Sequence, residues 1–61
     1  MTVTINIACD NAAFTDDAGT EINRILQDLV KEIKRGEIGI GDHMNLRDIN
    51  GNKVGECSVN E

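Results

Sequence analysis

Proline, tryptophan and tyrosine are absent from this chain, and Phe14 is its only aromatic residue. Any core must therefore be built mainly from aliphatic side chains. The chain has enough of these, since 39% of its residues are apolar and 28% are charged, the ordinary balance of a globular protein. No apolar run is long enough to cross a membrane. The segment Met1-Thr2-Val3-Thr4 also lacks the basic and apolar regions of a signal peptide. We therefore expect a cytoplasmic protein that makes no contact with a membrane.

Cysteine and histidine are also scarce. Cys9 and Cys57 are too few for a disulfide framework and form no CxxC motif, and His43 is the only histidine. This set is weak for zinc, so no metal or cofactor is expected. We interpret the two cysteines as small apolar core residues, although a disulfide between them stays open for an oxidised chain. His43 is expected to be an exposed loop residue, and no nucleophile and base are paired in the sequence, so no enzymatic activity is expected.

The chain has 61 residues and a net charge of −5. This length allows a single domain, residues 1–61, and a domain of this size buries only about 60% of its unfolded surface. Its stability is therefore marginal unless a second chain contributes, and a homodimer through a strand edge or a helix flank would relieve this. The acidic charge disfavours direct contact with nucleic acid and permits docking onto a basic protein surface.

The first two predicted elements are a strand and a helix. Alternation of Val3, Ile5 and Ile7 with polar residues predicts a half-buried strand. A helix follows, with Phe14 packing back on its first turn, Thr15 or Asp16 as its N-cap and Gly36 as a left-handed residue at its end. Its apolar positions recur with the period of an α-helix: Ile22, Ile25, Leu26, Leu29, Val30 and Ile33.

The C-terminal part predicts a hairpin after a glycine-containing connector, residues 37–43. Its arms are residues 44–49 and 52–59, joined by Asn50-Gly51, a dipeptide that favours tight primed turns. Pairing of Ile49 with Asn52 would gather the apolar residues of both arms on one face and leave Val54 on the polar face. A longer turn with Gly51 in a bulge would instead place Val54 beside Leu46.

Together these elements predict an α+β fold: a small β-α-β-β domain in which one helix packs on one face of a three-stranded sheet. The strand order stays open. With the C-terminal strand in the middle, all neighbours would be antiparallel, whereas adjacent first and second strands would be parallel. The uncovered sheet face would be polar, which suits either solvent or a binding partner.

Acidic residues cluster in the N-terminal half at Asp10, Asp16, Asp17 and Glu21. One interpretation is a contact surface for a basic partner, because exposed carboxylates can meet lysine or arginine side chains. The alternative is local: Asp10 forms a turn, and the others stabilise the positive end of the helix dipole. The sequence leaves both open, and we predict partner binding through these residues.

Three segments carry a resemblance to a known group of proteins. They are Asp10-Asn11-Ala12-Ala13-Phe14, Arg24-Ile25-Leu26, and the run from Leu46 to Gly55, which reads LRDINGNKVG. In this order they resemble a family of short, largely uncharacterised proteins encoded by bacteriophages and prophages. The family supplies no catalytic residues. The resemblance implies an accessory protein that binds a host protein in a fixed ratio, for example as an inhibitor of an antiviral defence complex. The alternatives are a self-assembling structural module and a dimer that sequesters a small ligand such as a nucleotide.

The helix pattern yields a first prediction. Replacing Leu29 or Leu26 by alanine should cost about 2–5 kcal/mol of unfolding free energy, because each would leave a cavity in a very small core. Replacing Asp16 and Asp17 by asparagine should cost little and serves as the control. Chemical denaturation of the variants measures both, and a Leu29→Ala variant as stable as the wild type would remove this helix face from the core.

Overall fold

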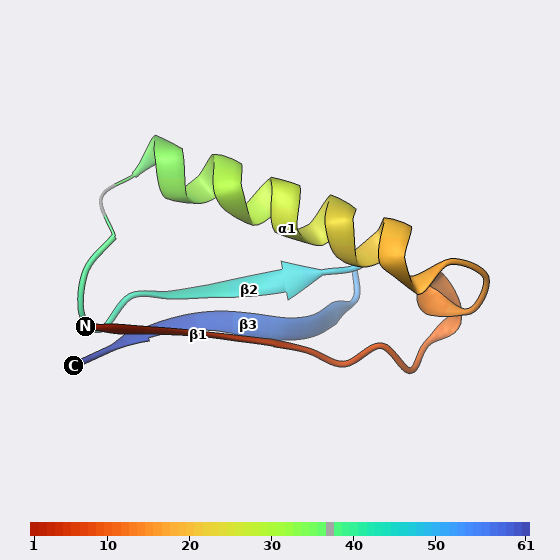
Figure 1. The fold of residues 1–61 in the computed structure, drawn as a ribbon, viewed down its shortest axis with the longest axis horizontal. Helices are drawn as coiled ribbons and strands as arrows, with labels where there is room; N and C mark the ends of the chain where they lie inside the picture. The colour runs from red at the N-terminus through yellow and green to blue at the C-terminus, as the bar shows by residue number, and fades with distance from the viewer. Residues whose placement is uncertain (37) are drawn as a thin grey trace.

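The computed structural model describes residues 1–36 and 38–61, and its elements follow the predicted β-α-β-β order (Figure 1). Strand β1 spans Thr2–Ile7, the 3-10 helix η1 spans Ala12–Phe14, and helix α1 spans Ala18–Arg35. Strands β2, His43–Arg47, and β3, Lys53–Asn60, complete the sheet. No described helix is both long enough and apolar enough to span a membrane.

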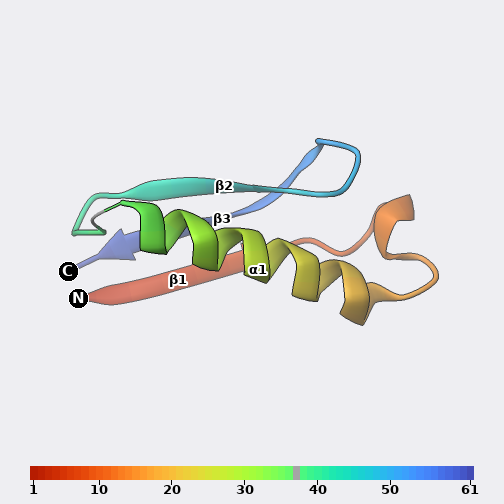
Figure 2. The ribbon, with the colours of Figure 1, turned by 90° about the horizontal axis from the view of Figure 1, so that it is seen from above.

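The sheet order is β1-β3-β2, and both pairings are antiparallel. This decides the question that the sequence left open, because the C-terminal strand lies in the middle. α1 packs on one face of the sheet and runs along it (Figure 2). The α+β fold class, with three strands and one helix on one face, is thus confirmed.

Helix α1 begins and ends differently from the prediction. Its N-cap is Asp17, not Thr15 or Asp16, because η1 and the bend after it occupy the preceding residues. Asp17 accepts a hydrogen bond from the Thr20 backbone N–H at 3.1 Å and one from its hydroxyl at 2.6 Å. Gly36 is extended, with φ −125° and ψ 168°, and not left-handed as predicted. Its N–H donates to the Glu32 carbonyl at 3.3 Å and closes the last turn.

The core lies between α1, η1, β2 and β3. Ile25 and Leu29 of the helix stripe are buried, whereas Leu26 is only half-buried and Val30 is 47% exposed. Phe14 is buried against the start of α1, as its position before the helix predicted. The buried apolar residues are Phe14, Ile25, Leu29, Leu46, Val54, Cys57 and Val59.

The hairpin register combines the two alternatives. Leu46 pairs with Gly55, as expected for the shorter turn, but Arg47 pairs with Lys53, so Val54 is an extra residue in β3. The prediction of a two-residue turn is therefore wrong. Gly51, with φ 86°, is the only residue of the turn with a positive φ. The irregularity also corrects the position of Val54, which is buried in the core and not on the polar face.

The prediction for the two cysteines is half correct. Cys57 is fully buried, as expected, but Cys9 is exposed, and both are free thiols. In the connector, Ile38 is half-buried and Ile40 is 61% exposed, while Glu37 lies outside the described residues. His43 is the first residue of β2 and not a loop residue.

Gly55 is required by close packing of backbone against backbone. A Cβ at this position would overlap the carbonyl oxygen of Asn6 on the neighbouring strand β1. Gly36 offers the opposite case, because a Cβ there would meet nothing within 4 Å and its φ of −125° suits any residue.

These two glycines generate the second prediction. Gly55→Ala should destabilise the protein by about 1–3 kcal/mol or more, since one of the two strands must move. Gly36→Ala should be neutral or stabilise by up to about 1 kcal/mol, because alanine restricts the unfolded chain. Thermal unfolding of both variants tests this, and equal stability of the two would contradict the close contact between β1 and β3.

Candidate functional site

The turn between β2 and β3 is built around the carboxylate of Asp48, which is 4% exposed. Its Oδ1 accepts hydrogen bonds from the backbone N–H groups of Asn50 and Asn52, both at 2.9 Å. Its Oδ2 accepts from the side-chain amides of Asn11 at 2.7 Å and Asn52 at 3.2 Å. One carboxylate therefore fixes the turn and ties it to the segment that leads into η1.

A second buried carboxylate, Glu21, ties helix α1 to the same turn. It is 6% exposed and accepts from Arg24 Nε at 2.9 Å, Arg24 Nη2 at 3.1 Å and the Ile49 backbone N–H at 2.8 Å. Arg24 also donates to the Arg47 carbonyl and to Asp28 Oδ2, each at 3.0 Å. A fork of guanidinium donors thus joins the first two turns of α1 to the end of β2.

These contacts bring together the three segments that carry the sequence resemblance. Asn11 belongs to the first segment, Arg24 to the second, and Arg47 to Asn52 to the third. In this structure their polar residues hold the turn, the helix and η1 in one arrangement. The side chains of Asn11, Arg24, Asp48 and Asn52 therefore have a structural role that needs no ligand.

The network also shifts the acidity of its carboxyl groups. Hydrogen bonds from Arg24 lower the pKa of Glu21, and the Ile49 N–H adds to this against the opposing effect of burial. Burial raises the pKa of Asp48, but hydrogen bonds from Asn52, Asn11 and Asn50 outweigh it and leave the pKa below its ordinary value. Both groups are therefore held in the charged form in the folded protein.

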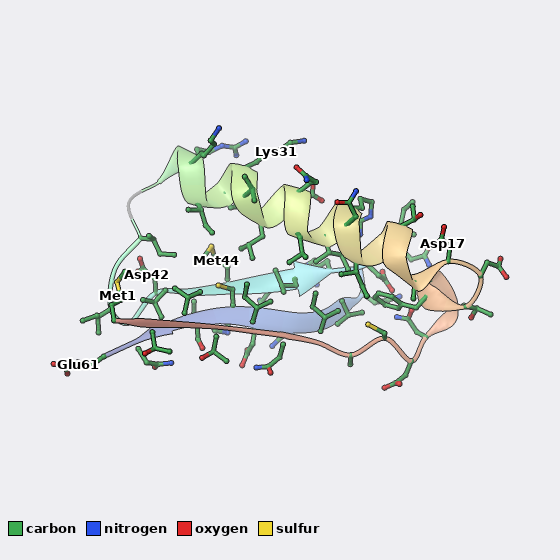
Figure 3. The ribbon with its side chains drawn as sticks, viewed as in Figure 1. Met1, Asp17, Lys31, Asp42, Met44 and Glu61 are labelled. Atoms are coloured by element: carbon green, nitrogen blue, oxygen red, sulfur yellow. The ribbon has the colours of Figure 1, made fainter. Side chains whose placement is uncertain are left out.

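The predicted contact residues Asp10, Asp16, Asp17 and Glu21 are placed in two different ways. Asp10 and Asp16 are exposed, and within residues 1–36 and 38–61 no hydrogen bond or ion pair engages their carboxylates. Asp17 is exposed but serves as the helix cap, and its hydrogen bonds with Thr20 lower its pKa. Glu21 is buried in the network. Of these four carboxylates, those of Asp10 and Asp16 form no hydrogen bond or ion pair with the described residues. Figure 3 shows Asp17 at the start of α1, at the other end of the molecule from Met1 and Glu61.

The sheet face away from α1 carries an exposed charged group. His43 Nε2 lies 2.6 Å from Glu56 Oε2, and Lys53 Nζ lies 3.5 Å from the same oxygen. His43 and then Lys53 lower the pKa of Glu56. Since each of these side chains is at least 40% exposed, we interpret the group as a cross-strand hydrogen bond between His43 and Glu56 beside a Lys53–Glu56 ion pair within β3, both of modest strength.

A groove of about 420 Å³ lies between α1 and β2. Ile25, Leu29 and Leu46 supply its apolar lining. Figure 3 shows Met44, another lining residue, between β2 and the helix, while Lys31 lies on the far side of α1. The polar lining residues are Arg24, Asp28, Glu32, Asn45, Arg47 and Asp48. Among the described residues, no group of three or more His, Cys, Asp or Glu side chains is placed to hold a metal ion.

Comparison with family models, with curated proteins and with solved structures found no match to this chain. The residues that sequence reasoning missed are Asn11, Arg24 and Asp48. A usable pattern was present for Asp48, since an aspartate before Asn-Gly can accept from the backbone two and four residues later. No pattern in the sequence indicates that Asn11 meets Asp48 across 37 positions.

The Asp48 network yields the third prediction. Because the pKa of Asp48 and of Glu21 is lowered by folding, the charged forms stabilise the fold above the unfolded pKa. That contribution is lost as the pH falls through the folded pKa, below about pH 4. Asp48→Asn should lower the melting temperature at neutral pH, since an amide NH2 would face donors, and should reduce the loss on acidification. Asp28→Asn, at an exposed ion pair, is the control. Melting curves from about pH 3 to pH 7 measure the effect, and an unchanged acid dependence in Asp48→Asn would contradict it.

Proposed function

We propose that this protein binds another protein in a fixed ratio, through an acidic surface that contains Asp10 and Asp16. The observation that carries the proposal is that both carboxylates are exposed and engaged by no described residue. The segment from 8 to 20 also contains three aspartates and no lysine, arginine or histidine. A surface of this kind attracts a basic partner and increases its association rate, and salt weakens the attraction.

The acidic segment is held in place before any partner arrives. Asn11 accepts from the Ala13 N–H at 3.0 Å and donates to Asp48, which anchors the residue next to Asp10. Asp17, next to Asp16, is fixed as the helix cap. Since less ordering is then required on binding, more of the interaction free energy is available as affinity.

The resemblance to phage and prophage proteins favours a bacterial host protein as the partner. We infer that the protein works in the cytoplasm of the host and blocks its target by occupying a basic surface, with a complex of antiviral defence as the leading target class. No enzymatic step and no cofactor are part of this proposal.

Binding of a small ligand is the competing function, because the groove between α1 and β2 exceeds the size of about 300 Å³ typical of ligand pockets. The lining has mixed charge: Asp28, Glu32 and Asp48 contribute carboxylates, and Arg24 and Arg47 contribute guanidinium groups. The chain as a whole carries a net charge of −5, which repels the phosphate groups of a nucleotide and attracts a basic protein. A basic protein partner therefore fits the charge of this chain better than a nucleotide.

The fourth prediction separates a contact surface from a general charge effect. Asp10→Asn with Asp16→Asn removes two negative charges from the acidic segment, and Glu32→Gln with Glu61→Gln removes two charges elsewhere. Both double variants should fold normally. Only the first should lose the host protein that the wild type captures from a bacterial lysate at low salt, with affinity reduced by about tenfold or more. Equal capture by both variants, or no capture by the wild type, would refute the proposal.

A further inference from the structure

Strand β1 is an edge of the sheet that carries none of the usual protection against pairing. It lies at one end of the order β1-β3-β2, and its sequence, TVTINI, contains no charge and no proline. Edge strands of monomeric proteins are usually blunted by lysine, proline, a bulge or a covering loop. In a chain with a net charge of −5, an uncharged edge is also a place where two copies can meet without repulsion.

Helix α1 leaves part of its own face of the sheet uncovered along β1. Val3 is 46% exposed and Ile5 is 44% exposed, although both lie on the face that carries α1. The sequence predicted a strand with one face buried. Val3 and Ile5 on that face stay partly exposed, because one helix about 10 Å across cannot cover three strands.

The helix flank toward β1 is apolar as well. Arg24, Asp28 and Glu32 line the groove on the β2 side of α1. By helical spacing, Leu26 and Val30 lie on the opposite flank, and Val30 is 47% exposed. An apolar surface therefore extends from the helix to the open edge of the sheet.

The backbone of β1 also has unused hydrogen-bonding groups. The Ala8 N–H donates to the carbonyl of Val54, in strand β3, at 2.7 Å. Since backbone groups alternate in direction along a strand, those of Val3, Ile5 and Ile7 point away from β3, toward the open edge. These are the residues whose side chains form the apolar face.

We propose that two copies of this chain pair through β1, antiparallel, about a two-fold axis at Thr4. In this register Val3 lies opposite Ile5 of the second copy, and Met1 lies opposite Ile7. On the other face Thr4 meets Thr4, and Thr2 meets Asn6. Apolar residues thus meet apolar ones, polar meet polar, and the outward backbone groups of Val3 and Ile5 bond to each other.

The dimer joins two three-stranded sheets into one sheet of six strands, with both helices on the same face. The Val30 flanks of the two helices then approach each other over the paired β1 strands. The other edge, β2, is less suited to self-pairing. A two-fold axis at Asn45 would place His43 opposite Arg47 of the second copy, so that two basic residue types would face each other. These comparisons favour β1 as the contact and a second copy as its occupant. The acidic surface takes no part in this inference.

Light scattering after size-exclusion chromatography tests the association. The wild type should have the mass of a dimer, and Ile5→Lys should raise the dissociation constant more than about tenfold, because it puts a charge on the apolar edge. Ile49→Lys makes the same change at an isoleucine that is 68% exposed in the β2–β3 turn, and it should stay dimeric. Circular dichroism checks that both variants are folded. A monomeric wild type, or a folded Ile5→Lys that stays dimeric, would overturn the proposal.

Cross-linking tests the register. With Cys9→Ser as the background, Thr4→Cys should form a disulfide-linked dimer under mild oxidation, because residues opposite each other at a site without hydrogen bonds have Cα atoms about 4.5 Å apart. Thr2→Cys, on the same strand face, should not cross-link, since the two copies of residue 2 would be about 14 Å apart along the strands. Efficient cross-linking of Thr2→Cys and not of Thr4→Cys would refute the axis at Thr4.

Discussion

The buried carboxylate of Asp48 holds together parts of the chain that are far apart in sequence. It accepts four hydrogen bonds, two from the turn backbone and two from the side-chain amides of Asn11 and Asn52. Such a group is costly to bury unless its lone pairs are used, and here all four donors converge on it. Asp48 and the neighbouring pair of Glu21 and Arg24 form a polar network that lies at one end of the small apolar core.

Four of the acidic residues show two contrasting roles. Glu21 and Asp48 are part of the folded structure, and their lowered pKa values reflect the donors around them. Asp10 and Asp16 are exposed and have no such donors. The two kinds cannot be told apart by residue type, because the difference arises from contacts such as that between Glu21 and Ile49, 28 positions apart.

Because a single helix covers the three-stranded sheet, both edges of the sheet are left partly uncovered. On the β2 side it leaves a groove with a polar rim, and on the β1 side it leaves Val3 and Ile5 partly exposed. The two edges therefore differ in character. Strand β2 contains His43 and Arg47, whereas β1 contains no charged residue. The proposed pairing of two copies uses the uncharged edge.

The sequence by itself determined the order and type of the strands and of the long helix, and the buried positions Ile25 and Leu29. These follow from local periodicity. For the hairpin it allowed two registers, and the structure shows that Leu46 pairs with Gly55. Only the tertiary structure decided the central position of β3, the burial of Val54 and the internal role of Glu21. Each depends on contacts across the chain: β1 pairing onto the far side of β3, an extra residue that bends β3, and a turn that meets the helix. Period and propensity act over a few residues, so they carry no information about which distant groups a carboxylate or a strand edge will meet.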